Sequence, residues 1–172
     1  MGREKDAPAG AGDRIFSSRE VQWVLDIGYS ALDDRVTSRL VSVRGAPRPG
    51  PGTARGFPFT SIVALAVLES LVDRFRAGHE GVRPILAAIC ACSAEQLEDT
   101  GEPLFLVWDG EAAAPEILHR REAALAVVAA RNGPAALVLN LSHFAADVRR
   151  RVELVDRMTA PDAPAPTVEE AP

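Results

Sequence analysis

Apolar residues recur at helical spacing along most of the chain, and near the N-terminus this spacing predicts two short helices. The first begins at Ser17, which forms a capping box with Glu20, so that each side chain satisfies a free backbone donor. Asp26-Ile27-Gly28 breaks the pattern after about two turns. A second helix is expected from Tyr29 to Ser38. Two short helices joined by a turn that contains glycine are typical of a helix-turn-helix motif.

The next pattern predicts a strand, a loop and a second strand. Leu40–Val43 and Phe57–Phe59 are the two strand candidates. Residues 44–56 between them hold too many prolines and glycines to pair as a sheet. Four arginines and no acidic residue lie between Arg39 and Gly56. A strand, a basic loop and a strand after a helix-turn-helix motif make a wing.

Two further helices are expected in the first half of the chain. Thr60 or Ser61 caps a long one, which Gly78 ends. Its apolar face consists of Ile62, Leu65, Leu68, Leu71, Val72 and Phe75. The next helix is expected over 82–92, with Pro84 in its first turn, where no backbone donor is needed.

The pattern changes period in the second half. Leu104–Trp108 is a continuous apolar run that indicates a buried strand. Asp109-Gly110 favours a tight hairpin after it, and residues 111–118 return as an irregular edge strand. A helix is expected over 120–130 and a second buried strand over 136–141. Ser142 then caps the last helix, whose apolar positions are Phe144, Ala145, Val148, Val152 and Val155.

These elements predict an α+β protein with an N-terminal winged helix-turn-helix domain, mostly α with a β-wing, and a small α/β module of the order β-β-α-β-α. The expected organisation is a disordered arm (1–13), the winged domain (14–92), a polar linker (93–103), the module (104–158) and a disordered tail rich in proline and acid (159–172).

Charge is unevenly distributed over the 172 residues. The whole chain carries a net charge of −5, whereas residues 14–60 hold seven arginines against four acids, a balance of +3. A basic segment in an acidic chain favours local contact with a polyanion. The longest apolar run, Ile62 to Leu68, is far shorter than the roughly 20 residues of a membrane span. We therefore expect no membrane contact and a cytoplasmic location, nucleoid-associated if the protein binds DNA.

Three segments carry a family resemblance: Phe16-Ser-Ser-Arg-Glu-Val, Tyr29-Ser-Ala-Leu-Asp, and Arg55-Gly-Phe-Pro-Phe-Thr-Ser-Ile-Val-Ala-Leu. They resemble the "(F/Y)-(S/T)-x-(R/K)-E-V-A", "Y-R-x-L-D-x-W" and "R-x-Y-x-F-x-D-(L/I)-V-A-L" segments of the MerR-like winged helix-turn-helix family of bacterial DNA-binding proteins. The second half is similar to a C-terminal module of some members, with an "L-V-x-D-G" strand and a later "V-L-N-L-x-x-(I/F)" strand. The resemblance covers residues 14–157.

The resemblance implies a transcriptional regulator that binds duplex DNA as a homodimer. The helix from Tyr29 would enter the major groove, and the wing would lie on the phosphate backbone. The implied DNA contacts are Arg19, Tyr29, Ser30, Arg35, Arg39, Arg44, Arg48 and Arg55. No enzymatic activity, cofactor or metal is expected.

Departures from the family pattern favour an alternative. Ser30 stands where the family has arginine, and Asp34 and Arg35 stand near the position of its tryptophan. Asp33 matches the family's own aspartate and is expected to brace the domain. Asp34 either accepts a hydrogen bond from a cytosine amino group or indicates that the helix no longer reads DNA. The alternative is a winged helix repurposed as a protein-interaction or assembly module.

Other candidate residues give weaker signals. Cys90 and Cys92 point to different faces of a helix, so we expect small buried residues rather than two ligands of one metal. Phe105 and Trp108 are candidate interface residues, because large aromatic residues are enriched at interfaces. If their strand lies at a sheet edge, it could pair with its copy in a dimer, and the module could also contact a second protein.

Overall fold

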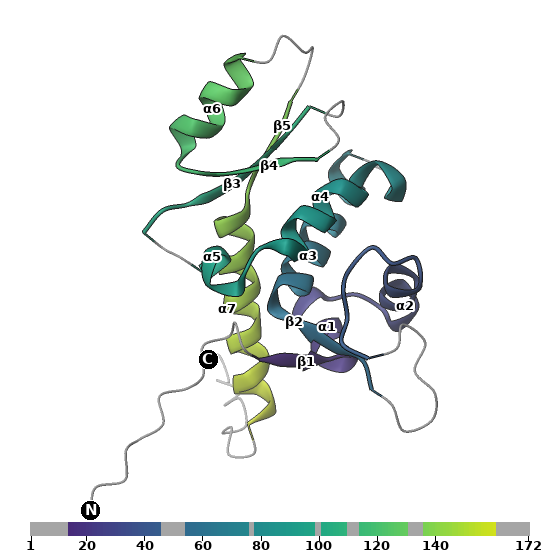
Figure 1. The fold of residues 1–172 in the computed structure, drawn as a ribbon. Helices are drawn as coiled ribbons and strands as arrows, with labels where there is room; N and C mark the ends of the chain where they lie inside the picture. The colour runs from purple at the N-terminus through teal and green to yellow at the C-terminus, as the bar shows by residue number, and fades with distance from the viewer. Residues whose placement is uncertain are drawn as a thin grey trace, which may run out of the picture.

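The computed structural model describes residues 14–45, 54–75, 78–98, 101–109, 114–130 and 136–160. The elements, in chain order, are β1 (Ile15–Ser17), α1 (Ser18–Leu25), α2 (Tyr29–Thr37), β2 (Gly56–Pro58), α3 (Phe59–Phe75), α4 (His79–Ala91), α5 (Ala94–Glu98), β3 (Leu104–Trp108), β4 (Glu116–His119), α6 (Arg121–Ala130), β5 (Leu137–Asn140) and α7 (Leu141–Thr159) (Figure 1). The fold is mixed α and β. Within these ranges no helix is long and apolar enough to cross a membrane.

The two short N-terminal helices are confirmed. α1 begins with the expected capping box, in which the Ser17 N–H donates to the Glu20 carboxylate at 2.7 Å and the Glu20 N–H donates to the Ser17 hydroxyl. Asp26 ends α1 in the left-handed region with φ 55°. Antiparallel strands β1 and β2 close this part of the fold, with Phe16 opposite Phe57. Both phenylalanines are fully buried.

The strand expected over Leu40–Val43 is absent from the described structure. Arg39 takes a left-handed conformation, φ 54°, which turns the chain directly after α2. Leu40 and Val41 are buried without pairing as a strand. Strand-like pairing begins only at Arg44, whose N–H and carbonyl both bond to Gly56, at 2.7 and 2.9 Å. Burial of apolar side chains therefore explains this run without a sheet.

Two helix starts differ from the expectation. α3 begins at Phe59, and the buried Ser61 hydroxyl donates to the Ser42 carbonyl instead of capping the helix. Gly78 is the N-cap of α4 and therefore opens this helix, while α3 is described as far as Phe75. Because α4 begins at His79, Pro84 lies beyond its first turn.

The polar segment expected to be a linker contains α5. Ser93 and Gln96 cap this short helix reciprocally, at 2.8 and 3.1 Å. Leu97 on α5 is only 1% exposed and belongs to the main core. Residues 93–98 are therefore part of the packed fold.

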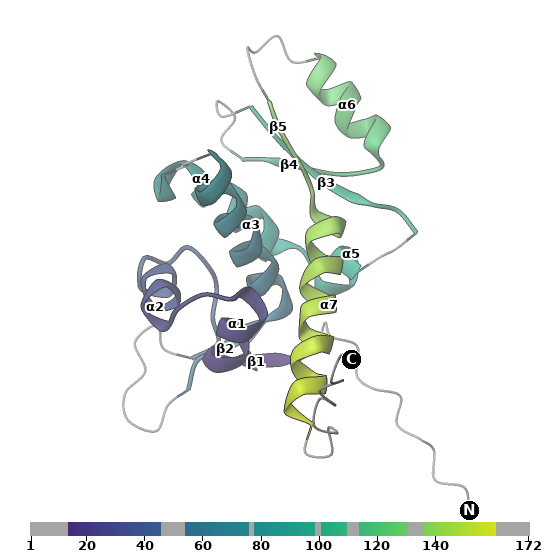
Figure 2. The ribbon, with the colours of Figure 1, turned by 180° about the vertical axis from the view of Figure 1, so that it is seen from behind.

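The second sheet is antiparallel with the order β4-β3-β5 (Figure 2). β3 is confirmed as a buried strand: Leu104 and Leu106 join the main core, and Phe105 and Val107 pack with α6. β4 is the expected edge strand. β3 itself lies in the centre, so it has no free edge with which to pair with a second copy of the chain.

The prediction of a tight hairpin at Asp109-Gly110 is wrong, because Val107 pairs with Glu116 across a longer connection. β5, expected to be buried, exposes 38% of Val138.

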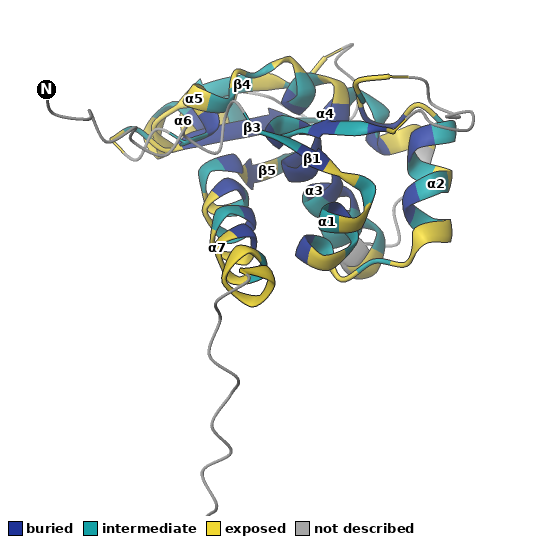
Figure 3. Ribbon diagram, turned by 90° about the horizontal axis from the view of Figure 1, so that it is seen from below, coloured by how far each residue is buried: buried dark blue, intermediate teal, exposed yellow. Residues whose placement is uncertain are grey.

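α7 joins the two halves of the chain. Asn140 caps it by accepting from the His143 N–H at 3.1 Å, whereas the Ser142 hydroxyl accepts from the Leu104 N–H at 2.8 Å. From the second sheet α7 runs back along α1 and α3. Leu141, Ala145, Val148 and Val152 belong to the same core cluster as Phe16 and Phe57. The C-terminal end of α7 is largely exposed (Figure 3).

Candidate nucleic-acid interface

Helix α2 lies on the opposite side of α1 and α3 from α7 in both ribbon views (Figures 1 and 2). Leu32 and Val36 are buried and fix its inner face. Its outer positions include Tyr29, which is 59% exposed, and Ser30. The two residues expected to approach bases from the start of this helix are therefore accessible to a ligand.

Arg55 was an expected phosphate contact, and the structure corrects this expectation. Its side chain is only 3% exposed, and its Nη2 donates to Asp33 Oδ1 at 2.7 Å. The pair connects the start of β2 to α2, so the expectation that Asp33 braces the domain is confirmed. Arg55 is a positioning residue, because its charge is used inside the protein.

Arg35 is corrected in the same way. Its side chain is 13% exposed and donates from Nε to Glu69 at 3.2 Å and from Nη1 to Asp34 at 3.0 Å. The first contact fastens α2 to α3. The second neutralises part of the charge of Asp34, whose side chain is 55% exposed. Arg35 is thus engaged by two carboxylates and is not available to DNA.

Arg39 and Arg44 remain available. Both are exposed, and neither guanidinium forms an ion pair with any residue that the structure describes. Gly45, with φ 91°, turns the chain directly after Arg44. At Gly56 a β-carbon would lie 2.5 Å from the Ile15 side chain, so the tight crossing of β1, β2 and the Arg44 backbone requires glycine here. Arg48 lies outside the described residues.

Two arginines near α1 differ in their surroundings. Arg19 is exposed, and its guanidinium carbon lies 4.5 Å from the centroid of the Trp23 ring, in a cation–π contact that leaves the charge unneutralised. Arg14 forms ion pairs with Glu20 and Asp156 and lies over Phe16. The hydrogen bond with Asp156 is the main reason that the pKa of Arg14 is raised. Arg19 is therefore the accessible cation of this pair.

The predicted interface aromatics are buried in one case and half-buried in the other. Phe105 is 8% exposed and packs with Val107 and Ala124 of α6. Trp108 is half-buried against the main core. Sequence reasoning missed five large apolar residues that are exposed: Trp23, Leu125, Val138, Leu154 and Met158. The i, i+4 spacing of Leu154 and Met158, off the buried face of α7, is the signal that could have identified two of them.

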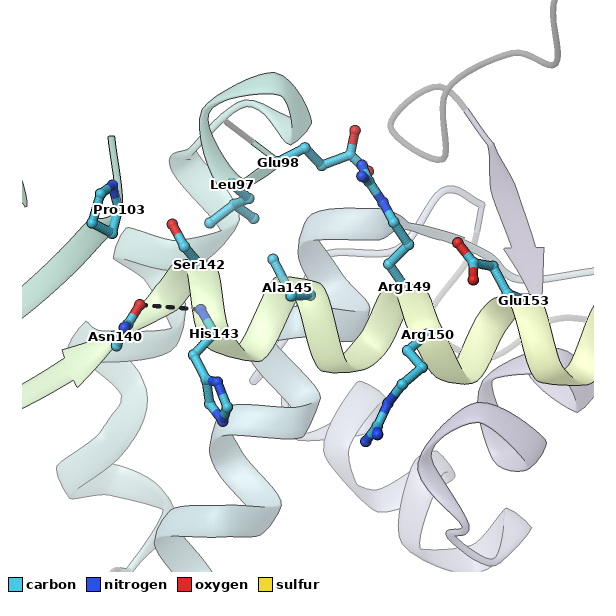
Figure 4. A pocket seen from close by; sticks show the side chains of 11 residues that line it. Leu97, Glu98, Pro103, Asn140, Ser142, His143, Ala145, Arg149, Arg150 and Glu153 are labelled. Atoms are coloured by element: carbon cyan, nitrogen blue, oxygen red, sulfur yellow. Dashed lines mark hydrogen bonds and ion pairs between the residues drawn. The ribbon is translucent and has the colours of Figure 1, made fainter. Parts of the chain in front are cut away.

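A pocket of about 410 Å³ lies beside α5 and α7. On one side Arg149 forms an ion pair with Glu98, and on the other side of α7 lie His143 and Arg150 (Figure 4). The polar groups that line the pocket point away from one another (Figure 4), and the charges of Arg149 and Glu98 neutralise each other. The arrangement gives no convergent set of groups for a ligand.

The cysteines are poor candidates for chemistry. Cys90 and Cys92 are both free and half-buried. Burial raises the pKa of both thiols, and a thiol with a raised pKa is a weak nucleophile and metal ligand at neutral pH. Over the described ranges, no three His, Cys, Asp or Glu residues come together as a metal site would require.

A search of protein-family models and of curated proteins finds no match to this chain.

Proposed function

We propose that the chain is a winged-helix protein that binds duplex DNA, with α2 as the recognition helix and the segment around Arg44 and β2 as the wing. The element order β1-α1-α2-β2-α3 supports this assignment. One observation carries it: Arg39, directly after α2, and Arg44, paired with Gly56 of β2, are exposed and form no ion pair with any described residue. The inner arginines Arg35 and Arg55 hold α2 in place. The charges of Arg39 and Arg44 are therefore accessible to a ligand.

The number of available cations sets the expected affinity. Arg19, Arg39 and Arg44 are three exposed arginines per copy. Each phosphate neutralised contributes about 0.9 to the salt slope, so one copy would give a slope of about −3. A protein with so few phosphate contacts binds DNA weakly, and such proteins usually bind as two copies on paired half-sites. We therefore propose a homodimer that acts as a bacterial transcriptional regulator in the cytoplasm or nucleoid and performs no chemistry of its own.

Fluorescence anisotropy with a labelled duplex of mixed sequence tests this function. The full chain is expected to bind at about 50 mM salt and to lose affinity steeply as salt rises. The double variant Arg39→Gln/Arg44→Gln should bind at least about tenfold more weakly. Arg121→Gln, an exposed arginine on α6 with no ion pair among the described residues, is the matched control. No binding at low salt, or an equal loss in the control, would refute the proposal.

The second candidate is a protein-interaction module. Asp34 is exposed on α2, and Tyr29 at the start of the same helix is an accessible aromatic residue. An exposed aromatic side chain suits a protein partner, whereas an exposed carboxylate repels a phosphate backbone. Absence of DNA binding, with α2 intact, would favour this candidate.

A further inference from the structure

The turn after α2 holds Arg39 in a backbone conformation that residues other than glycine rarely adopt. Arg39 has φ 54°, in the left-handed region. Its N–H donates to the Val36 carbonyl at 3.0 Å, and the Leu40 N–H donates to the Arg35 carbonyl at 3.0 Å. This pair of bonds forms a Schellman motif, in which the left-handed residue is usually glycine. An arginine at this position is strained, so the surrounding structure must hold it there.

Two contacts outside α2 hold this turn. Leu40 and Val41 are buried in the main core, which anchors the chain directly after Arg39. From α4, Arg83 Nη1 donates to the carbonyls of Ser38 and Arg39, at 3.3 and 3.4 Å. Carbonyl groups at the end of a helix have no donor within the helix. Arg83 therefore supplies a donor to the turn from a residue 44 positions away from Arg39.

The side chain of Arg83 is itself fixed on α4. Its neighbours on the helix, Val82 and Leu86, are buried in the main core, so the backbone that carries Arg83 is anchored. Arg83 Nη2 donates to the Glu80 carboxylate at 3.1 Å, which orients the guanidinium. A positive charge at the C-terminal end of α2 also interacts favourably with the helix dipole. Both terminal nitrogens of Arg83 are thus engaged within the protein.

We propose that Arg83 is a positioning residue for the DNA contact of Arg39. Arg39 is exposed and pairs with no carboxylate among the described residues, so the direction of its side chain depends on the turn that carries it. Without Arg83, water would solvate the carbonyls of Ser38 and Arg39, and the strained turn would be free to relax. The inference rests on the proposed function, because that function assigns a phosphate contact to Arg39.

A direct phosphate contact by Arg83 is the rival explanation, since its side chain is 42% exposed. The two roles differ in how the losses combine. A residue that acts through Arg39 has no further effect on DNA binding once the Arg39 guanidinium is removed, whereas an independent contact is lost in either background. The salt dependence separates the two roles as well, because each phosphate contact adds about 0.9 to the slope.

A double-mutant cycle of the full chain with Arg83→Met and Arg39→Gln tests the proposal, measured by fluorescence anisotropy with duplex DNA over a range of salt concentrations. Arg83→Met alone should weaken binding at low salt by about threefold or more. In the Arg39→Gln background it should change neither the affinity nor the salt slope further. Arg157→Met is the matched control: Arg157 also donates to a backbone carbonyl, at 3.2 Å, but within α7, across the molecule from α2.

Hydrogen exchange followed by NMR, without DNA, tests the contact between Arg83 and the turn separately. In Arg83→Met the amides of Arg39 and Leu40 should exchange about fivefold faster or more, because the bonds of the Schellman motif open more often. The increase should exceed any change at Leu65, which lies in the core of α3 and reports on the whole fold.

Three results would overturn the proposal: a further loss of about 0.9 in the slope when Arg83→Met is added to Arg39→Gln, unchanged exchange at Arg39 and Leu40, or an equal loss of binding in Arg157→Met. The first would show that Arg83 contacts a phosphate itself. A wild type that binds no DNA refutes the proposed function instead, and hydrogen exchange then still decides whether Arg83 holds the turn.

Discussion

Arginines around α2 and β2 fall into two groups with different surroundings. We call Arg35 and Arg55 the base, and Arg39 and Arg44 the rim. At the base, Arg35 and Arg55 are nearly buried and paired with carboxylates. At the rim, Arg39 and Arg44 are exposed and pair with no carboxylate among the described residues. A buried guanidinium must be paired because its desolvation is costly, whereas an exposed one keeps its charge for a ligand. Counting arginines in the sequence therefore overstates the number of exposed cations that a ligand could reach.

The largest effect is expected from Arg55→Met, which removes the charge at the base and keeps the apolar stem. Asp33 then loses its partner, but it is 39% exposed and regains some hydration. We expect a loss of about 2 to 3 kcal/mol in the free energy of unfolding, at the lower end for a broken buried pair. Urea denaturation measures it. If Arg44→Gln, the matched change at the rim, destabilises the protein as much, the distinction between base and rim is wrong.

A smaller effect, a gain in affinity for DNA, is expected from Asp34→Asn. The substitution removes an exposed negative charge from the middle of α2 and keeps the shape of the side chain. If α2 faces phosphates, affinity for duplex DNA at low salt should rise by about threefold, and the gain should shrink as salt screens it. Glu122→Gln, on the exposed surface of α6, is the control. A weaker complex would mean that Asp34 contacts a base or that α2 does not face DNA.

The smallest effect concerns pH and the capping box. Burial raises the pKa of Glu20, but the hydrogen bonds from Ser17 and Arg14 outweigh it, so the net pKa is lowered. A carboxyl group with a lowered folded-state pKa contributes stability above its unfolded pKa and loses it as pH falls through the folded value. Glu20→Gln should therefore flatten the fall in stability between about pH 5 and pH 3. Identical pH profiles for wild type and variant would contradict this account of Glu20.

Local signals in the sequence predicted the local structure well. The capping box of Ser17 and Glu20, the short helix α2 and the buried strand β3 each depend on neighbouring residues, and all three are confirmed. The strand expected over Leu40–Val43 was wrong because apolar residues can be buried in a loop as well as in a sheet. The expected cap of α7 was wrong: Ser142 accepts from the Leu104 N–H of β3, a long-range partner, and Asn140 caps the helix instead.

The candidate site was harder to predict because long-range partners decide which arginines are available. Arg35 is paired with Glu69, which is 34 positions away, and Arg55 with Asp33, which is 22 positions away. No local pattern distinguishes these arginines from Arg39 and Arg44. The sequence predicted that arginines gather in this segment, while the division into base and rim required the folded arrangement.

The most direct test of the central claim is the salt dependence of DNA binding for single arginine variants. The slope of log affinity against log salt should become shallower by about 0.9 in Arg44→Gln, because one phosphate contact is lost. Arg35→Met, at the base, should keep the wild-type slope wherever the protein remains folded. An unchanged slope in Arg44→Gln, or a reduced one in Arg35→Met, would contradict the assignment of the outer arginines to DNA.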